Sequence, residues 1–208
     1  MKHLKPMEIE ENSFAIITAE LAAMGAQIAP ENSLVLKRVI HTTADFEYLE
    51  NLCFSQGVCA HAIETLKAGA AIVTDTSMAM AGINKKILAA LGGEVHCFVA
   101  DESVAAEALA RGVTRSTIAV ERACSMTKPL IYVVGNAPTA LIRLDALIKE
   151  GKINPALIIG VPVGFVNVVE SKELIMQSGV PYIVAKGRKG GSNVAAAIIN
   201  ALLYQIKR

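Results

Sequence analysis

A chain of 208 residues has the length of one domain, which on folding buries roughly 70 % of the surface that its unfolded form exposes. Hydrophobic residues make up 53 % of it, aromatic residues only 4 %, and tryptophan is absent, so Ala, Val, Ile and Leu must form the core. That composition favours helices on a buried parallel sheet, whose strands read as continuous aliphatic runs. The net charge of +1 gives no field for nucleic acid or a membrane surface, and both are excluded as partners.

The cysteines and the apolar stretches predict a cytoplasmic protein. Four cysteines show no CxxC pair, which favours buried, reduced thiols: Cys53, Cys59, Cys97 and Cys124. Residues 1–13 carry acids where a signal peptide needs an apolar segment. The longest apolar stretch, 156–169, is interrupted by Pro162 and two glycines and falls short of the ~20 residues of a membrane span.

The first third of the chain predicts mostly helices. Residues 10–25 form one, and the segment PENSLVLKRVIH predicts a second, because Pro30 and Glu31 suit a first helical turn and the pattern ends near His41. Alternate residues from Val35 to His41 would also fit one face of a strand, so that alternative stays open. Residues 52–56 favour an edge strand before a helix at 57–68.

From residue 70 onward, aliphatic runs alternate with amphipathic stretches. The runs are 70–76, 94–100, 130–135, 156–163 and 182–187, and the helical stretches are 101–110, 115–126, 138–150 and 170–178. Repeated strand and crossover helix is the signature of an α/β fold. We therefore expect one domain over residues 1–208, a three-layer α/β/α arrangement with a mostly parallel sheet.

Four glycine- or proline-rich turns follow or precede the predicted strands: TDTSMAMAG (74–82), GNAPTAL (135–141), GVPVGFVNVVESK (160–172) and GRKGGSNVAAA (187–197). Ligands of such sheets bind where strand ends meet helix N-termini, and the cations at 186, 188 and 189 favour an anionic ligand with carboxylates or phosphates. Any one of these turns could equally serve only to reverse the chain. Phosphate-loop, GxGxxG and GxSxG motifs are missing, which disfavours a usual nucleotide fold and a serine hydrolase.

His41 is the strongest candidate for chemistry. Arg38 lies one helical turn before it, Asp45 lies close enough to orient an imidazole, and a C-terminal helical turn favours the protonated ring, so it can act as an acid near neutral pH. The other histidines, His3, His61 and His96, fit a terminal tail, a helix and an interrupted strand. Cys59 and His61 have no recognised ligand spacing, so no protein-bound metal is expected.

Several motifs span nearly the whole chain: NSFAII (12–17), RVIH (38–41), LKAGAAIVTDTSMAMAGI (66–83), TRS (114–116), GNAPTAL (135–141), GVPVGFVNVVESK (160–172) and GRKGGSNVAAAIINAL (187–202). Together they resemble the motifs of the precorrin-8X (or cobalt-precorrin-8) methylmutases of cobalamin biosynthesis. Asn167, where a small residue is expected, and the TTAD after His41 depart from some relatives.

The resemblance implies an isomerase that moves a methyl group from C-11 to C-12 of a tetrapyrrole, without an external methyl donor or a cofactor. The histidine of the family falls on His41, which would protonate or hydrogen-bond a ring nitrogen of the substrate. Ser13, Arg38 and Arg115 fall on positions that contact the substrate, and the family forms homodimers with active sites near the subunit interface. Further substrate-binding residues are predicted in or beside the matching motifs: Thr42, Asp75, Ser116, Asn136, Lys186, Arg188 and Ser192.

Two other functions compete with this one. A non-catalytic corrinoid carrier that sequesters the intermediate would need similar binding residues, and only turnover separates it from an enzyme. A general α/β sugar or nucleotide isomerase would bind phosphosugars rather than corrinoids, and it rests on fold class alone. The motifs are shared by the cobalt-free and cobalt-containing pathways, so both forms of the substrate stay open.

Overall fold

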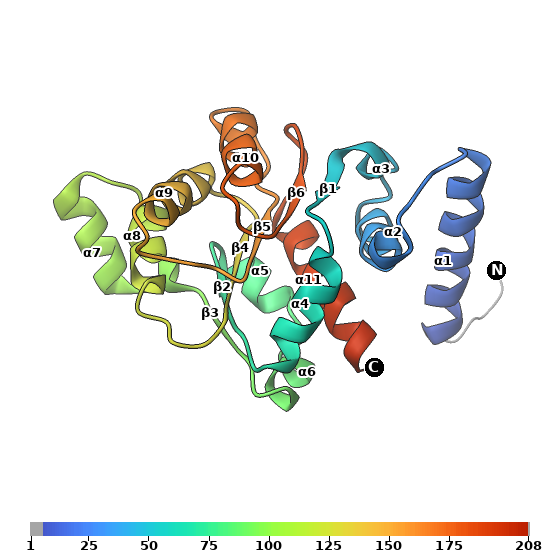
Figure 1. Ribbon diagram of the computed structural model, residues 1–208, viewed down its shortest axis with the longest axis horizontal. Helices are drawn as coiled ribbons and strands as arrows, with labels where there is room; N and C mark the ends of the chain where they lie inside the picture. Colours follow the sequence, from blue (N-terminus) through green and yellow to red (C-terminus); the bar gives the residue numbers. More distant parts are fainter. Residues whose placement is uncertain (1–5, 208) are drawn as a thin grey trace.

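The computed structural model describes residues 6–207, and of Pro6 and Met7 only the backbone. His3 therefore lies outside the described residues. One six-stranded sheet runs through the molecule with helices on both faces, which confirms the predicted three-layer α/β/α class (Figure 1). Among the described helices, none is both long enough and apolar enough to cross a bilayer.

The sheet is parallel except at one edge. Its strand order is β1-β6-β5-β4-β2-β3, and β1 pairs with β6 antiparallel. The strands are β1 (Leu52–Phe54), β2 (Ala71–Thr74), β3 (Glu94–His96), β4 (Leu130–Val134), β5 (Leu157–Gly160) and β6 (Tyr182–Ala185). Each predicted aliphatic run contains one of these strands, and the predicted edge strand is confirmed as β1.

Two sets of helices cover the two faces of the sheet. One face carries α2 (Ser33–Thr43), α4 (Val58–Lys67), α5 (Ser77–Gly82), α6 (Lys85–Ala90) and α11 (Ser192–Ile206). The other carries α8 (Arg115–Ala123), α9 (Pro138–Lys149) and α10 (Val168–Met176). Outside these layers, α1 (Pro6–Ala23) packs on α2, and α7 (Glu102–Arg111) packs on α8. Short helices complete the fold: α3 (Tyr48–Asn51) and the 3-10 turns Pro30–Asn32 and Phe98–Ala100.

The segment that ends in His41 is helical, and the alternative of a strand is wrong. Val35 and Val39, together with Leu36 and Ile40, are buried on one side of α2, which is the spacing of a helix face. The helix ends at Ala44, whose backbone has a φ of 52° and whose N–H donates to the carbonyl of Ile40 at 2.7 Å. The sequence did not predict the short helices α3, α5 and α6.

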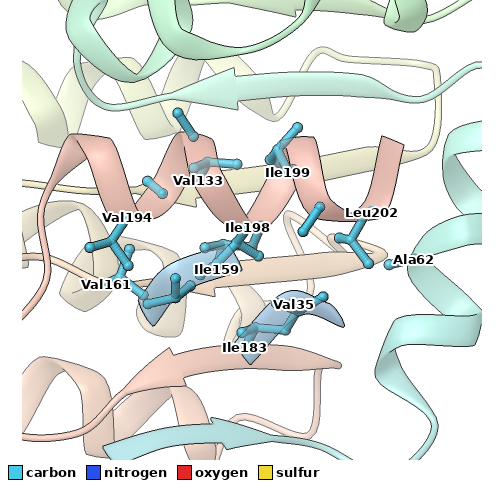
Figure 2. Close-up of a cluster of buried hydrophobic side chains, with 14 of the residues drawn as sticks. Val35, Ala62, Val133, Ile159, Val161, Ile183, Val194, Ile198, Ile199 and Leu202 are labelled. Atoms are coloured by element: carbon cyan, nitrogen blue, oxygen red, sulfur yellow. The ribbon is translucent and has the colours of Figure 1, made fainter. Parts of the chain in front are cut away.

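The main core lies between α11 and the sheet. Nine residues of α11 are buried, and in Figure 2 Val194, Ile198 and Leu202 lie among side chains of the strands beneath and of α2. Several alanines on α11 let its backbone come close to the sheet. Burial of each large aliphatic side chain contributes about 1.5–3 kcal/mol, so this layer fixes α2 and the strand ends relative to each other.

Strand order reverses direction beside β2. The chain leaves β2 toward β3 on one side, and β4 returns on the other side of β2 before the chain continues to β5. In open α/β sheets the crevice at such a reversal, at the carboxyl ends of the strands, is the usual ligand site. Here that crevice lies between Asp75, after β2, and Gly135, after β4.

Candidate active site

The crevice between β2 and β4 is occupied by a carboxylate of the protein itself. Asp75 is 2 % exposed; Oδ1 accepts the N–H of Gly135 at 2.7 Å, and Oδ2 accepts those of Asn136 and Ala137 at 2.8 and 2.7 Å. Burial raises the pKa of the Asp75 carboxyl, and the three donors offset this in part. Through these three hydrogen bonds Asp75 holds the GNAPTAL turn in place. Direct contacts of Asp75 and Asn136 with a substrate stay predictions.

The four glycine- and proline-rich turns meet at this edge of the sheet. Ser192 Oγ lies 2.7 Å from Thr76 Oγ1, and a Cβ on Gly135 would come within 2.7 Å of the Cα of Ser192. A Cβ on Gly190 would lie 2.1 Å from the carbonyl oxygen of Val161. Only glycine permits these approaches, so both glycines bring the turns together.

The loop between β6 and α11 also reaches the segment that follows His41. Lys189 Nζ pairs with Asp45 Oδ2 at 2.5 Å and with Glu47 Oε2 at 2.9 Å. The Lys189 ammonium holds the pKa of Asp45 below its usual range. Asp45 therefore pairs with Lys189, and the expectation that it orients the imidazole of His41 is wrong.

His41 lies in the last turn of α2 and faces a cavity between α1 and α2. The cavity has a volume of about 300 Å³ and is lined by Ser13, Ile16, Ile17, Glu20, Ile40, His41, Ala44 and Phe46. The ring of Phe14 lies 5.4 Å from the imidazole, centroid to centroid, at an angle of 30°. Within residues 6–207, neither ring nitrogen of His41 has a hydrogen-bond partner, so the exposed ring is available to a ligand.

Two predicted hydroxyl groups lie on the same two helices, Ser13 on α1 and Thr42 on α2. Ser13 lines the cavity and donates to the carbonyl of Ile9 at 2.8 Å, and Thr42 donates to the carbonyl of Arg38 at 2.9 Å. Because each hydroxyl proton is used within its own helix, each oxygen can still accept a hydrogen bond.

Arg38 fastens α1 to α2. Its guanidinium pairs with Glu10 and lies 4.6 Å from the ring centroid of Phe14 and 5.4 Å from that of Tyr204. The side chain is only 15 % exposed. Arg38 thus places Phe14 against His41, and a direct contact with substrate stays a prediction.

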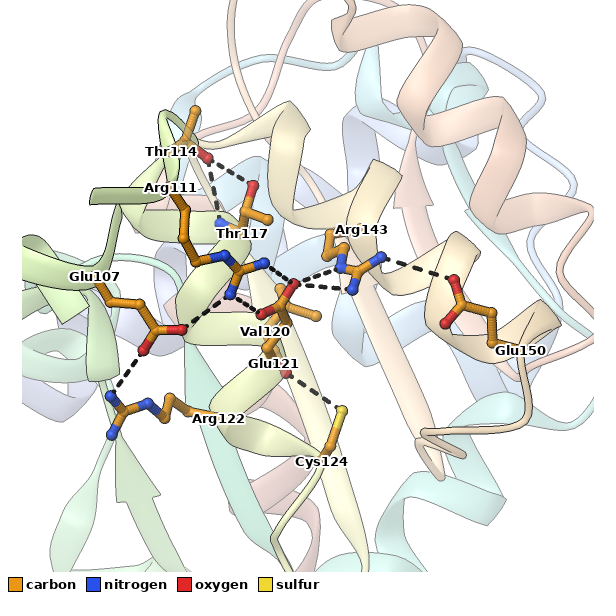
Figure 3. Close-up of polar contacts among 10 residues, drawn as sticks. All are labelled: Glu107, Arg111, Thr114, Thr117, Val120, Glu121, Arg122, Cys124, Arg143 and Glu150. Atoms are coloured by element: carbon orange, nitrogen blue, oxygen red, sulfur yellow. Dashed lines mark hydrogen bonds and ion pairs between the residues drawn. The ribbon is translucent and has the colours of Figure 1, made fainter. Parts of the chain in front are cut away.

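Arg115 and Ser116 are the first two residues of α8. Thr114 caps this helix and donates to Thr139 Oγ1 at 3.1 Å, which ties α8 to the GNAPTAL turn. Figure 3 shows how ion pairs of Glu121 with Arg111 and Arg143 join α7, α8 and α9. Arg115 is not among the residues that line the cavity of His41, and in Figure 1 α8 and α2 lie on opposite sides of the sheet.

Three predicted cations carry no carboxylate partner in the part of the chain that the structure describes. They are Arg115, Lys186 and Arg188, and all are exposed. Arg188 lies over the ring of Phe165 at 5.2 Å, and exposed apolar side chains near this edge include Met78, Val163, Phe165 and Val166. A flat, apolar ligand with carboxylates fits such a surface.

Comparison with known proteins decides the family. The family model described as precorrin-8X methylmutase matches residues 8–205. This chain is a precorrin-8X methylmutase family member. The cobalt-precorrin-8 methylmutase of Salmonella typhimurium is 45 % identical over 98 % of this chain and 97 % of that protein, and the precorrin-8X methylmutase of Pseudomonas aeruginosa is 41 % identical over 93 % of each. The solved precorrin-8X methyl mutase of Thermus thermophilus superposes with a TM-score of 0.85 at 41 % identity and covers 94 % of this chain and 96 % of that one.

Membership in the methylmutase family confirms the resemblance drawn from the motifs. The curated relatives carry methylmutase names, and the alternative of a non-catalytic carrier finds no support among them. Sequence reasoning nevertheless passed over Phe14, Phe165 and Lys172, although all three lie within the quoted motifs. The sequence could have pointed to them, because an aromatic residue or a lysine within an otherwise apolar motif is not needed for packing alone.

The cysteines of this methylmutase family member are free thiols. Cys59 and Cys97 are buried as expected, and Cys53 is partly buried. Cys124 is exposed, so the expectation of a buried thiol is wrong for it. Among the described residues, no three His, Cys, Asp or Glu side chains gather closely enough to hold a metal ion.

Proposed function

We propose that this protein moves the methyl group on C-11 of precorrin-8X, or of cobalt-precorrin-8, to C-12, giving hydrogenobyrinate or cobyrinate. The bond from the methyl carbon to C-11 breaks as the bond to C-12 forms, in a 1,5-sigmatropic shift within one molecule. Because substrate and product are isomers, no methyl donor, oxidant or reductant enters the balance. The enzyme needs to bind the macrocycle and adjust the electron density of its conjugated ring.

The unengaged imidazole of His41 carries this proposal. It lies in the last turn of α2 and opens onto a cavity with mostly apolar walls. We assign His41 the role of a general acid: it either protonates a ring nitrogen of the substrate or donates a hydrogen bond to it while the methyl group migrates. Ser13, across the same cavity, supplies an oxygen that can accept a hydrogen bond from the substrate.

The carboxylates of the substrate fit the unpaired cations. A cavity of about 300 Å³ admits only part of a tetrapyrrole, so the remainder would lie over the neighbouring surface. Lys186 and Arg188 lie on the loop that Lys189 joins to the segment after His41. We propose that these two cations pair with carboxylates at the rim of the macrocycle.

We further propose that the protein works as a homodimer. Arg115 and Ser116 do not line the cavity of His41, and α8, which they open, lies across the sheet from α2 (Figure 1), so they would complete the site if a second copy supplied them. On α1, Ile16, which lines the cavity, exposes 58 % of its surface and Ile9 exposes 51 %, as an interface would use. The free thiols support the prediction that the protein acts in the cytoplasm.

The activity is tested by incubating the purified protein separately with precorrin-8X and with cobalt-precorrin-8. We expect the absorption change that accompanies corrin formation with at least one of them, and the one that reacts identifies the natural form. A carrier would bind the macrocycle without that change. Binding without conversion of either form would overturn the proposal.

The shared site is tested by co-expressing two inactive variants, His41→Ala and Arg115→Ala. Random pairing makes half of the dimers mixed, and each mixed dimer has one intact site of two, so about a quarter of wild-type turnover should return. Each variant alone is the control. Recovery of no activity from a protein that runs as a dimer in light scattering would place Arg115 and His41 in the same or in unrelated sites.

A further inference from the structure

The loop from Gly187 to Gly191 has three consecutive carbonyl groups held in place. Lys172 Nζ donates to the carbonyl oxygens of Gly187 and Lys189 at 2.8 and 2.9 Å. The carbonyl between them, that of Arg188, accepts the N–H of Gly164 at 3.1 Å. These three bonds fix the backbone at Gly187, Arg188 and Lys189 before any ligand arrives.

Lys172 is an unusual residue to do this. It comes from the middle of α10 and is fully buried, and among the described residues no carboxylate neutralises its ammonium. Burial lowers the pKa of Lys172 to about 8. Taking an ammonium out of water costs several kcal/mol unless hydrogen bonds compensate, and two carbonyl groups of this loop supply them, so the burial of Lys172 is coupled to the conformation of the loop.

The consequence falls on the side chain of Arg188. With the carbonyl groups on both sides of it bonded to Lys172, Arg188 is exposed and its guanidinium lies over Phe165. Phe165 follows Gly164, whose N–H donates to the carbonyl of Arg188. The two loops are therefore joined twice, by this hydrogen bond between their backbones and by the contact of the Arg188 guanidinium with the Phe165 ring. Phe165 is 80 % exposed and offers a ring face next to a cation.

We infer that Lys172 is a positioning residue that holds Arg188 and Phe165 as a preformed cation–aromatic pair for the substrate. In this arrangement Arg188 receives a carboxylate of the macrocycle, and Phe165 contacts its apolar face. The inference rests on the proposed function, because it takes the carboxylate-rich tetrapyrrole as the ligand. Preorganisation of this kind raises affinity by reducing the ordering that binding requires.

A double-mutant cycle tests it, with the dissociation constant of hydrogenobyrinate measured by absorption titration. Lys172→Met keeps the length of the side chain but removes its donors, and it should weaken binding by about tenfold in the otherwise wild-type protein. With Arg188→Gln already present, the same change should cost less than about twofold. With Arg115→Gln, the matched control cation on α8, the full effect should persist. Lys172→Gln, which keeps a neutral amide donor, should recover part of the affinity and replaces Met in the cycle if that variant does not fold.

The outcomes separate the two claims. Equal loss from Lys172→Met with and without Arg188 would show that Lys172 serves stability alone and would overturn the inference, as would no loss at all. If hydrogenobyrinate fails to bind wild-type protein, or if Arg188→Gln and Arg115→Gln both leave its affinity unchanged, the proposed function itself fails. Melting temperatures of all variants show that each measurement is made on folded protein.

Discussion

The crevice between β2 and β4 and the cavity between α1 and α2 differ in how their polar groups are satisfied. In the crevice, the carboxylate of Asp75 takes three backbone N–H donors, and nothing is left over for a ligand from that set. In the cavity, His41 has a ring neighbour but no hydrogen bond within the described residues. The crevice is therefore held by hydrogen bonds of the protein itself, whereas the cavity leaves the ring nitrogens of His41 available to a ligand.

This difference shows that a protein with an open α/β sheet can have its candidate active site away from the usual ligand position of that fold. The usual ligand position of an open α/β sheet is filled by the side chain that follows β2, while α1 and α2, at the β1 edge, form the candidate catalytic pocket. Lys189 connects the two regions, because its loop leaves β6 and its ammonium binds Asp45 and Glu47. The sheet and the turns at the carboxyl ends of its strands, here called the frame, therefore support a pocket that lies beside them.

His41→Ala should produce the largest effect and is the most direct way to break this comparison. Loss of a general acid lowers turnover by about 10²–10⁴-fold, whereas removal of an exposed side chain changes the unfolding free energy by less than about 0.5 kcal/mol. Turnover by absorption and stability by urea denaturation check both. His61→Ala, another exposed helical histidine, is the control. Wild-type turnover in His41→Ala would end the assignment of this pocket.

Asp75→Asn should show the opposite pattern. The amide nitrogen would face backbone N–H groups that need an acceptor, so we expect a loss of about 2 kcal/mol of unfolding free energy. For a chain of this size that lowers the melting temperature by roughly 6 °C. Turnover well below the melting temperature should stay within about threefold of wild type, since the same turn still forms. Asp101→Asn, an exposed carboxylate at the start of α7 without a side-chain cap, should change neither quantity. A large loss of turnover with unchanged stability would make Asp75 a substrate contact after all.

The elements of the frame could be predicted from the sequence because the patterns that mark them lie within a few neighbouring residues. Aliphatic runs mark each strand, and Pro30 marks the start of the turn that leads into the helix of His41. The pocket was only half readable. Asp45 is four residues from His41 in sequence but pairs with Lys189, 144 residues away, and no local pattern announces a partner at that distance. The same holds for Arg38, which looks like a free cation until Glu10 and Tyr204 are placed around it.

Arg38→Lys sharpens the comparison on the side of the pocket, with a smaller effect. Lysine keeps the charge but loses the planar guanidinium that stacks on Phe14 and Tyr204, a loss worth about 1 kcal/mol. We expect turnover to fall about fivefold, as α1 and Phe14 hold His41 less firmly. Lys37→Ala, the neighbouring cation on α2, serves as the control. Cleavage of α1 by a protease should become faster in Arg38→Lys alone, and an unchanged cleavage rate would mean that α1 is held by other contacts.

The smallest expected effect concerns the frame and is a dependence of stability on pH. The pKa of Lys172 lies near 8 in the folded protein because of burial, whereas in the unfolded chain it has its ordinary value of 10.5. Between these values the unfolded chain binds more protons than the folded one, so the contribution of Lys172 to stability rises with pH. Relative to Lys172→Met, the wild-type protein should gain on the order of 1 kcal/mol in unfolding free energy from pH 8 to pH 10. Urea denaturation of both proteins at each pH measures the difference, in which the titration of all other groups cancels. A difference that stays constant over this range would mean that the ammonium is hydrated, and Lys172 would then lack the burial that makes it a fixed point of the loop.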